Sequence, residues 1–274
     1  MKTLRVTFKL IVLFFLFIIC IVFLGIFKGI ICLFSPIKAD KMIFYAIKPF
    51  TAFLRKICGI HLQVEGKENI PPKNGFLIVS NHYSYVESVC ILSIIPAVPV
   101  SKAEVRTWPL IGWVTRLIGT IFVEREKGGL SGTYIEELIK TLKKGINIVF
   151  YPEGTTTDGT YLRPFKSALF VPANRLKVPV LPVVSKVTAI NGAPFSLEQR
   201  DWVAWYDNAP LVPHVLRILS LRRIDIRYKI GKPIIPNYDD SSLEERRRFS
   251  EIVQHQMDAF LREIDPNYQG IRHE

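Results

Sequence analysis

One segment near the N-terminus limits what this chain can fold into more than any other feature. Leu10 to Phe27 is an unbroken run of 18 residues without a charged side chain, and after Lys28 the apolar character continues to Phe34. About 20 apolar residues are enough to cross a hydrocarbon core of roughly 30 Å. Because a backbone in lipid must satisfy its own hydrogen bonds, we expect this run to form a helix.

A cleaved signal peptide is the alternative interpretation of this run. Its basic start fits a signal peptide, but the apolar stretch is longer than the roughly 7–15 residues of a signal-peptide core. The sequence that follows, Cys32 to Pro36, is also a poor small-residue cleavage site. We therefore expect a retained membrane helix, which either spans the bilayer or only dips into it.

The flanks of the run are strongly basic. The chain has a formal net charge of +12, and most of the excess lies in residues 1–60, which hold nine basic side chains and one acidic residue, Asp40. Nucleic-acid binders normally carry their excess on the folded body, so this pattern favours an anionic membrane surface and excludes nucleic acid as the partner. More basic residues follow the run than precede it, which favours a cytoplasmic body. The nine are Lys2, Arg5, Lys9, Lys28, Lys38, Lys41, Lys48, Arg55 and Lys56.

A second segment near the N-terminus, residues 41–58, carries an apolar stripe punctuated by basic side chains. This pattern is typical of a helix that lies in the headgroup region of a membrane. It would equally suit a helix that packs on the core of the domain. We therefore predict a membrane anchor in residues 1–58, made of one membrane helix or two interfacial helices, and a second domain in residues 59–274.

Beyond residue 59 the sequence alternates between predicted strands and predicted helices. Such alternation is typical of an α/β domain with a mostly parallel sheet flanked by helices. Charged residues are 22% of the chain and the four cysteines show no CxxC spacing, which excludes disordered and disulfide-rich proteins. The predicted strands are 60–64, 75–79, 119–123, 146–151, 178–185 and 224–230, and the predicted helices are 87–95, 132–144 and 243–264.

His82 stands apart from the other histidines because it directly follows a predicted strand, after the polar Ser80 and Asn81. The carboxyl ends of strands are where α/β folds usually place ligand chemistry. Glu87 lies five residues further on, an offset of about 140° on an ideal helix. The two side chains can meet only if His82 precedes the helix. Glu87 could then fix the tautomer and leave a basic nitrogen. By spacing alone, a histidine near an acid is more often an ordinary surface or satisfied polar residue.

Residues 151–159 form a second candidate loop, Tyr-Pro-Glu-Gly-Thr-Thr-Thr-Asp-Gly, directly after a predicted strand. Exposed N–H groups and hydroxyls in such a turn can bind an anionic oxygen. Cations such as Arg163 and Lys166 follow closely, and a phosphate would need them. In isolation the segment would also suit an ordinary polar loop.

Signatures of several other enzyme classes are missing from the sequence. It contains no P-loop, no GxGxxG after a strand and no GxSxG elbow. No set of His, Cys and Asp residues has the spacing of metal ligands. We therefore expect neither a metal site nor a nucleotide cofactor.

Four blocks together resemble the 1-acylglycerol-3-phosphate acyltransferases, a family of lysophospholipid acyltransferases. Residues 81–87 (Asn-His-Tyr-Ser-Tyr-Val-Glu) are similar to its NHxxxxD block, and residues 119–125 are similar to GxxFxxR. Residues 151–155 (Tyr-Pro-Glu-Gly-Thr) are similar to FPEGT, and residues 178–182 (Val-Pro-Val-Leu-Pro) to a VPVxP-type strand. All four occur in the family's order within residues 75–185, so the resemblance is far more specific than any single block.

The resemblance implies acyl transfer from acyl-CoA or acyl carrier protein to the free hydroxyl of a lysophospholipid. With 1-acylglycerol-3-phosphate the product is phosphatidic acid, a step of phospholipid biosynthesis. His82 is then the general base, oriented by Glu87, and the acceptor attacks the thioester directly, without an acyl-enzyme. The donor is a substrate, so no cofactor is implied. The residues implied in substrate binding are Lys102, Arg125, Glu153, Gly154, Thr155 and Lys166.

The chain departs from the family pattern at two places. Glu87 stands where the family has Asp, one methylene shorter, so the carboxylate reaches the imidazole only if the backbone retreats slightly. Thr156 and Thr157 stand where Arg-Ser is common, which removes a potential phosphate cation. Arg163 or Lys166 would take its place, or the acceptor is another lysophospholipid or a lyso-aminolipid. A catalytically silent lipid-binding protein is a third interpretation.

Overall fold

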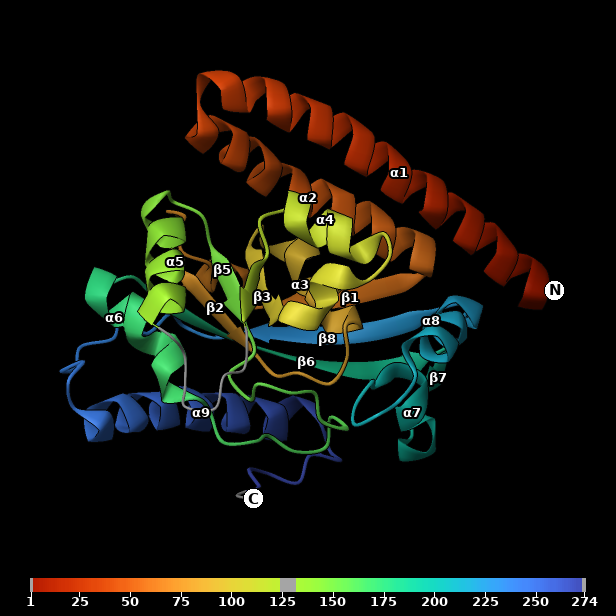
Figure 1. Ribbon diagram of the computed structural model, residues 1–274. Coiled ribbons are helices and arrows are strands. Elements are labelled where there is room, and N and C mark those ends of the chain that lie inside the picture. The colour runs from red at the N-terminus through yellow and green to blue at the C-terminus, as the bar shows by residue number, and fades with distance from the viewer. Residues whose placement is uncertain (1, 124–131, 273–274) are drawn as a thin grey trace.

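The computed structural model describes residues 2–123 and 132–272 (Figure 1). Its centre is a sheet of β1 (Ile60–Glu65), β2 (Leu77–Ser80), β3 (Val98–Lys102), β4 (Ile121–Val123), β5 (Ile148–Phe150), β6 (Val180–Ile190), β7 (Ala193–Pro194) and β8 (Ile224–Ile230). The spatial order is β1-β8-β6-β2-β5-β3-β4, and the short β7 pairs with β6.

The sheet is mostly parallel, as the alternating pattern predicted. The neighbours β6, β2, β5, β3 and β4 all run in the same direction. β8 lies antiparallel to β6 and pairs in parallel with β1, so β8 and β1 run opposite to these five strands, as does the short β7. The carboxyl ends of β2, β5, β3 and β4 therefore meet along one edge, which is where parallel sheets place ligand sites.

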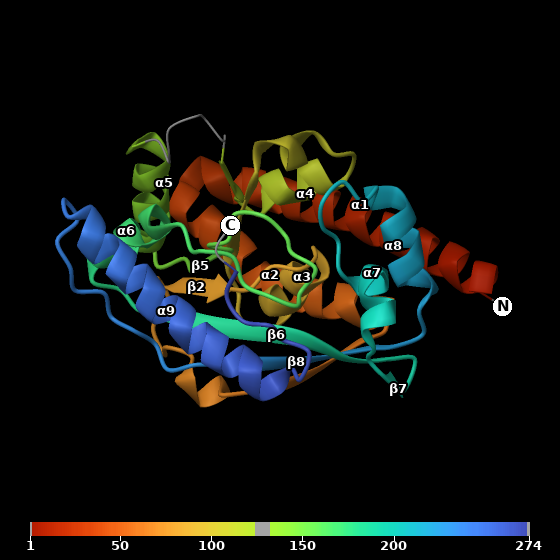
Figure 2. The same cartoon turned by 90° about the horizontal axis from the view of Figure 1, so that it is seen from below.

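Helices cover both faces of the sheet (Figure 1). One face packs against α3 (Val86–Ile94) and α8 (Leu211–Ser220), and the other packs against α5 (Gly132–Lys143), α6 (Val171–Leu176) and α9 (Leu243–Ile264). Figure 2 shows α9 running across β6 and β8. Successive residues of β2 point to opposite faces of the sheet. Ile78 packs in the core on the α3 and α8 side, whereas Leu77 and Val79 pack in the core on the α5, α6 and α9 side. A strand that is buried on both faces is apolar throughout, which explains the continuous apolar runs.

The N-terminal segment forms a hairpin of two antiparallel helices, α1 (Lys2–Phe34) and α2 (Pro36–Cys58) (Figure 1). Ser35 separates them, and its side chain accepts a hydrogen bond from the Lys38 N–H while Pro36 begins α2, a normal N-terminal pair. Gly59 ends α2 with a φ of 78°, a conformation that glycine adopts without steric cost. By length and composition α1 could cross a membrane.

Three cations of α1 hold it along the body of the protein. Arg5 Nη1 donates to Ser220 O at 2.9 Å, and Lys28 Nζ donates to Leu117 O at 3.1 Å. Lys9 is only 7% exposed, and its Nζ donates to Cys58 O and Leu221 O, both at 2.9 Å. These carbonyls lie at the carboxyl ends of α8, of α4 (Ile111–Leu117) and of α2. Cations at this end of a helix satisfy unpaired carbonyls and oppose its dipole.

We expect Lys9→Met to destabilise the protein, because it leaves the buried Leu221 carbonyl and the partly buried Cys58 carbonyl without their donor. The loss is about 1–3 kcal/mol in free energy of unfolding, since each unsatisfied buried polar group carries a desolvation cost. Thermal unfolding in detergent would measure it. Lys48→Met on the exposed side of α2 is the matched control, and equal melting temperatures for the two variants would contradict this role of Lys9.

Candidate active site

The predicted site residues lie together at the carboxyl edge of the sheet. His82 follows β2, residues 151–155 follow β5, and Lys102 is the last residue of the adjacent β3. The sequence predicted each segment separately, and the parallel pairing brings them side by side. The predicted phosphate contact Arg125 lies outside the described residues.

His82 and Glu87 form a direct pair. His82 Nδ1 lies 2.5 Å from Glu87 Oε1, although the two residues are five positions apart. The reason is the start of α3: its first helical residue is Val86, so His82 stands on the turn before the helix while Glu87 is in its first turn. This is the geometry that the sequence spacing required for contact.

The surroundings of Glu87 hold its carboxylate in one orientation. Glu87 is fully buried, and its Oε1 also accepts a hydrogen bond from the Ser84 N–H at 3.0 Å. Tyr228 Oη on β8 donates to the Glu87 backbone carbonyl at 3.0 Å and fixes the start of the helix. The carboxylate therefore acts as an acceptor for Nδ1–H. The second ring nitrogen, Nε2, is then the unprotonated one that can take a proton.

Tyr151 stacks on one face of the His82 imidazole ring. The two rings stack with centroids 4.0 Å apart and an interplanar angle of 18°. His82 is thereby held between a buried carboxylate and a buried aromatic ring, while its side chain is still 21% exposed. A catalytic base needs both this fixed orientation and access to its substrate.

Glu153 connects the two loops of the site. It is 4% exposed, its Oε1 accepts from the His82 N–H at 2.8 Å, and its Oε2 accepts from the Arg163 N–H at 3.0 Å. A third link is the hydrogen bond from Thr157 N to His82 O at 2.9 Å. The structure thus places the Glu153 carboxyl group against the protein backbone, where it can position His82, and each of its oxygens has a backbone N–H as partner.

Burial raises the pKa of Glu153 from its ordinary value of 4.5 to about 8, against the opposing effect of the two N–H donors. Between these values the unfolded chain has released the proton and the folded chain retains it. Rising pH therefore favours unfolding in this window, by up to about 1.4 kcal/mol per pH unit. We expect the stability of the wild type to fall relative to Glu153→Gln, which cannot titrate, as the pH rises from 5 to 8.

Urea unfolding of both proteins across this pH range measures the effect. A difference in unfolding free energy that stays constant with pH would show that Glu153 is ionised throughout.

Gly154 and Lys166 meet at the turn of the second loop. Gly154 has a φ of +73°, and a Cβ there would lie 2.7 Å from Lys166 Nζ. The turn is closed by the Gly154 N–H donating to Tyr151 O at 3.0 Å. Any larger residue would both strain the backbone and displace the lysine. Thr155 is half-buried beside this turn, whereas Lys166 and Lys102 are exposed, so cations and a hydroxyl lie on the accessible side of the edge.

Several residues that build the site were not predicted. Ser84 binds the Glu87 carboxylate through its backbone N–H, and Tyr228 reaches the Glu87 carbonyl from the distant strand β8. The stacking of Tyr151 on His82 depends on the pairing between β2 and β5. Asn81 bridges to β6 through Ser185, with its Oδ1 accepting from the N–H at 2.9 Å and its Nδ2 donating to the carbonyl at 3.1 Å. The family block around His82 includes Asn81, so the sequence did contain a signal for this residue.

In residues 2–123 and 132–272, His, Cys, Asp and Glu form no group of three that could hold a metal ion.

The chain is similar in sequence to known acyltransferases. A family model described as Acyltransferase matches residues 61–186. Lyso-ornithine lipid O-acyltransferases from Rhizobium meliloti (strain 1021) and Brucella abortus (strain 2308) are 30% and 32% identical, over 67% and 68% of this chain. The 1-acyl-sn-glycerol-3-phosphate acyltransferase from Neisseria meningitidis serogroup B (strain MC58) is 29% identical over 56% of the chain. The matches span 64%, 71% and 58% of these relatives, respectively.

The fold has a counterpart among solved structures. The crystal structure of the 1-acyl-sn-glycerophosphate (LPA) acyltransferase from Thermotoga maritima superimposes with a TM-score of 0.64 at 23% identity, and the match covers 95% of this chain and 98% of that one. That likeness concerns the fold, and the sequence identity to the Brucella relative carries the family assignment. The chain belongs to the family of lysophospholipid (glycerolipid) acyltransferases.

Proposed function

We propose that this protein transfers an acyl group from a thioester, acyl-CoA or acyl carrier protein, to the free hydroxyl of a lysolipid. The observation that carries the proposal is the His82–Glu87 pair, in which a buried carboxylate lies 2.5 Å from Nδ1 of a partly exposed imidazole. Such a pair is suited to removing a proton from a hydroxyl. Family membership supplies the reaction class.

The residues suggest the following sequence of events. His82 Nε2 removes the proton of the acceptor hydroxyl as its oxygen attacks the thioester carbonyl. Glu87 stabilises the imidazolium that forms. Collapse of the tetrahedral intermediate breaks the carbon–sulfur bond, and the imidazolium returns its proton to the leaving thiolate. The products are the acylated lipid and the free thiol, and no acyl-enzyme is formed.

One acceptor to consider is 1-acylglycerol-3-phosphate, which would yield phosphatidic acid. The accessible side of the edge carries Lys102 and Lys166, and Arg125 follows β4, the neighbour of β3. Cations and the Thr155 hydroxyl are the groups that a phosphate monoester needs. Under this proposal Gly154 shapes the turn, and Glu153 contributes by positioning His82.

A lyso-aminolipid is the second candidate acceptor. Two observations favour it. The relatives with 30% and 32% identity bear the name lyso-ornithine lipid O-acyltransferase. In addition, Thr156 and Thr157 stand where the resembling family commonly has Arg-Ser, so one potential phosphate cation is missing.

We further propose that the α1–α2 hairpin holds the active site at the cytoplasmic face of a membrane. Both lipid substrate and product reside in the bilayer, so the site must lie near it. The apolar side chains of α1 are largely exposed, which supports burial in lipid. The cations that join α1 to α8, α4 and α2 support a hairpin that lies against one leaflet.

An acyl-transfer assay with the purified full chain tests the function. Acyl-CoA and acyl carrier protein serve as alternative donors, with 1-acylglycerol-3-phosphate, lyso-ornithine lipid and other lysophospholipids as acceptors. We expect a diacylated product with at least one acceptor, detected by mass spectrometry. Lipid binding without product formation for every combination would favour the silent lipid-binding protein and contradict the proposal.

A further inference from the structure

Helix α1 is apolar around most of its circumference. Phe14 and Phe23 stand about 180° apart on the helix, yet both side chains are exposed. A helix that only rests on a membrane has a polar outer side, whereas three cations of α1 point to carbonyls of the protein. In a membrane, lipid therefore surrounds α1 on its outer side and its flanks. The helices beneath α1 then lie at the level of the head groups, because a helix is only about 10–12 Å across.

Two helices of the body, α4 and α8, lie beneath α1 (Figure 1). Lys28 Nζ donates to Leu117 O at the end of α4, and Arg5 Nη1 donates to Ser220 O at the end of α8. Arg5 lies near the start of α1 and Lys28 near its end, roughly 35 Å apart along the helix axis. Both body helices therefore lie next to the lipid around α1, at two well-separated points.

The outward side chains of α4 and α8 are apolar and basic. Trp113 on α4 is 56% exposed, and Val212 and Leu216 on α8 are 67% and 39% exposed. Arg116 stands one turn after Trp113, Arg217 follows Leu216, and both arginines are exposed. Neither helix contains an acidic residue. A tryptophan, apolar side chains and cations that meet anionic lipid are the composition of a membrane interface.

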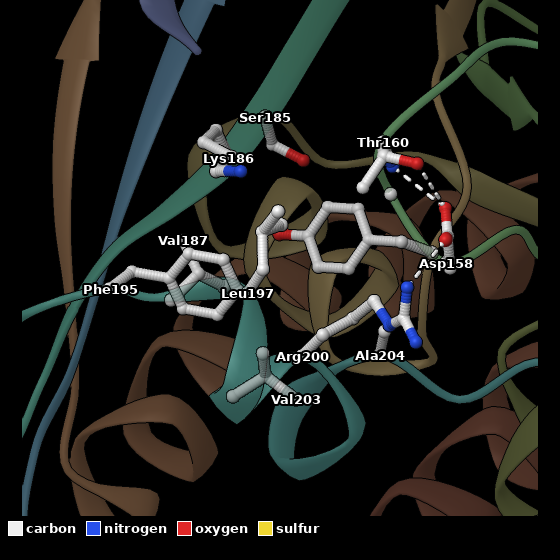
Figure 3. A pocket seen from close by; sticks show the side chains of 12 residues that line it. Asp158, Thr160, Ser185, Lys186, Val187, Phe195, Leu197, Arg200, Val203 and Ala204 are labelled. Atoms are coloured by element: carbon white, nitrogen blue, oxygen red, sulfur yellow. Dashed lines mark hydrogen bonds and ion pairs between the residues drawn. The ribbon is translucent and has the colours of Figure 1, made fainter. Parts of the chain in front are cut away.

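Helix α8 is also joined to the catalytic loops. Tyr85 Oη, on the turn between His82 and Glu87, lies 2.9 Å from Nδ1 of the buried His214 on α8. Arg200, which precedes α8 in the chain, pairs with Asp158 of the second loop at 3.0 Å, and Figure 3 shows its guanidinium directed at that carboxylate. The position of α8 relative to a membrane therefore also sets the position of the catalytic base.

We propose that α4 and α8 form a second membrane contact. Trp113, Val212 and Leu216 enter the interface of the anionic leaflet that holds α1, and Arg116 and Arg217 bind its phosphate groups. The inference rests on the proposed placement of the hairpin in the membrane and goes beyond it. The hairpin alone fixes the body along one line and leaves it free to rotate about that line. Contact at α4 and α8 fixes this rotation and holds the catalytic turn at a constant distance from the leaflet.

Fluorescence quenching by brominated lipid tests the contact without any need for activity. The full chain is bound to vesicles of phosphatidylcholine and phosphatidylglycerol, in which part of the phosphatidylcholine carries bromine on its acyl chains near the head group. We expect Trp113→Phe to lose part of the quenching that the wild type shows. Adding Ile252→Trp to this variant places a tryptophan on the exposed side of α9, across the sheet from the hairpin, and should not restore it.

Quenching that is equal in the wild type and Trp113→Phe, or that Ile252→Trp restores, would overturn the second contact. The hairpin has its own readout, flotation of the protein with the vesicles. A wild type that does not float would overturn the hairpin placement together with this inference, whereas a wild type that floats without quenching of Trp113 overturns the second contact alone.

A double substitution on α8 tests the consequence for catalysis. Val212→Glu with Leu216→Glu should raise the KM for the wild type's best acceptor in these vesicles about tenfold or more, because two apolar contacts with lipid are lost. The KM for a short-chain, water-soluble analogue of that acceptor should stay the same.

Leu243→Glu with Ile252→Glu, at exposed apolar positions of α9, is the matched control and should change neither KM. An increase of less than tenfold, or an equal increase for both acceptors, would overturn the proposal. A wild type that acylates neither acceptor would contradict the acyl-transfer function, while the quenching experiment still decides on the contact.

Discussion

Glu87→Gln is expected to lower kcat by about 100-fold or more, the lower end of what general base catalysis contributes. Glu87 Oε1 accepts from both the imidazole Nδ1 and the Ser84 N–H. A glutamine can keep its oxygen toward Ser84, but it brings no negative charge to stabilise the imidazolium. If it rotates, its amide donates to Nδ1 and selects the tautomer whose Nε2 is protonated and cannot act as a base.

Glu87→Asp is the informative companion variant. Its carboxylate keeps the charge but is one methylene shorter, in a site where Glu87 already approaches His82 to 2.5 Å. We expect it to retain most of the activity that Glu87→Gln loses, after a small shift of the first turn of α3. Initial rates at saturating acceptor, with circular dichroism as the check on folding, measure both. Equal rates for wild type and Glu87→Gln would show that the carboxylate has no part in catalysis.

Much of the fold was predictable because its strongest signals are local. The predicted strand 224–230 and helix 243–264 coincide with β8 and α9. Each has a clear apolar period, and α9 has a serine N-cap in Ser242. By contrast α4 and α8 were not predicted. α4 has seven residues and begins after Leu110, whose φ is 60°, without a capping side chain. Nothing in so short a stretch distinguishes a helix from a loop.

The strand directions illustrate the limit of sequence patterns. The alternation predicted a mostly parallel sheet, which the structure confirms, but the antiparallel pairing of β8 with β6 leaves no local signal. Pairing of distant strands depends on tertiary packing, because the side-chain period of a strand is the same in both directions. The predicted strand also ended at residue 185, whereas β6 continues to Ile190. The additional residues pair with β8, a partner that is distant in the sequence.

The segments that form the site were predictable from the sequence, but most of the contacts between them were not. The turn before α3 allowed His82 and Glu87 to meet, as the spacing required. The family pattern places Glu153 among the substrate contacts, but the structure puts its oxygens on the N–H groups of His82 and Arg163. That arrangement depends on β2 and β5 lying side by side, which no single segment reveals. The same holds for the Tyr151 ring stacked on His82.

His82→Ala tests whether the His82 imidazole is the general base of acyl transfer. The substitution removes the base but leaves the Glu153 contact, which uses the His82 backbone N–H. The folded protein should therefore persist. The measurement is acyl transfer from a labelled thioester donor to the best acceptor of the wild type, with lipid binding followed in parallel. We predict lipid binding near the wild-type level and an acyl-transfer rate reduced about 100- to 10,000-fold. A correctly folded His82→Ala protein that transfers acyl groups at the wild-type rate would contradict it.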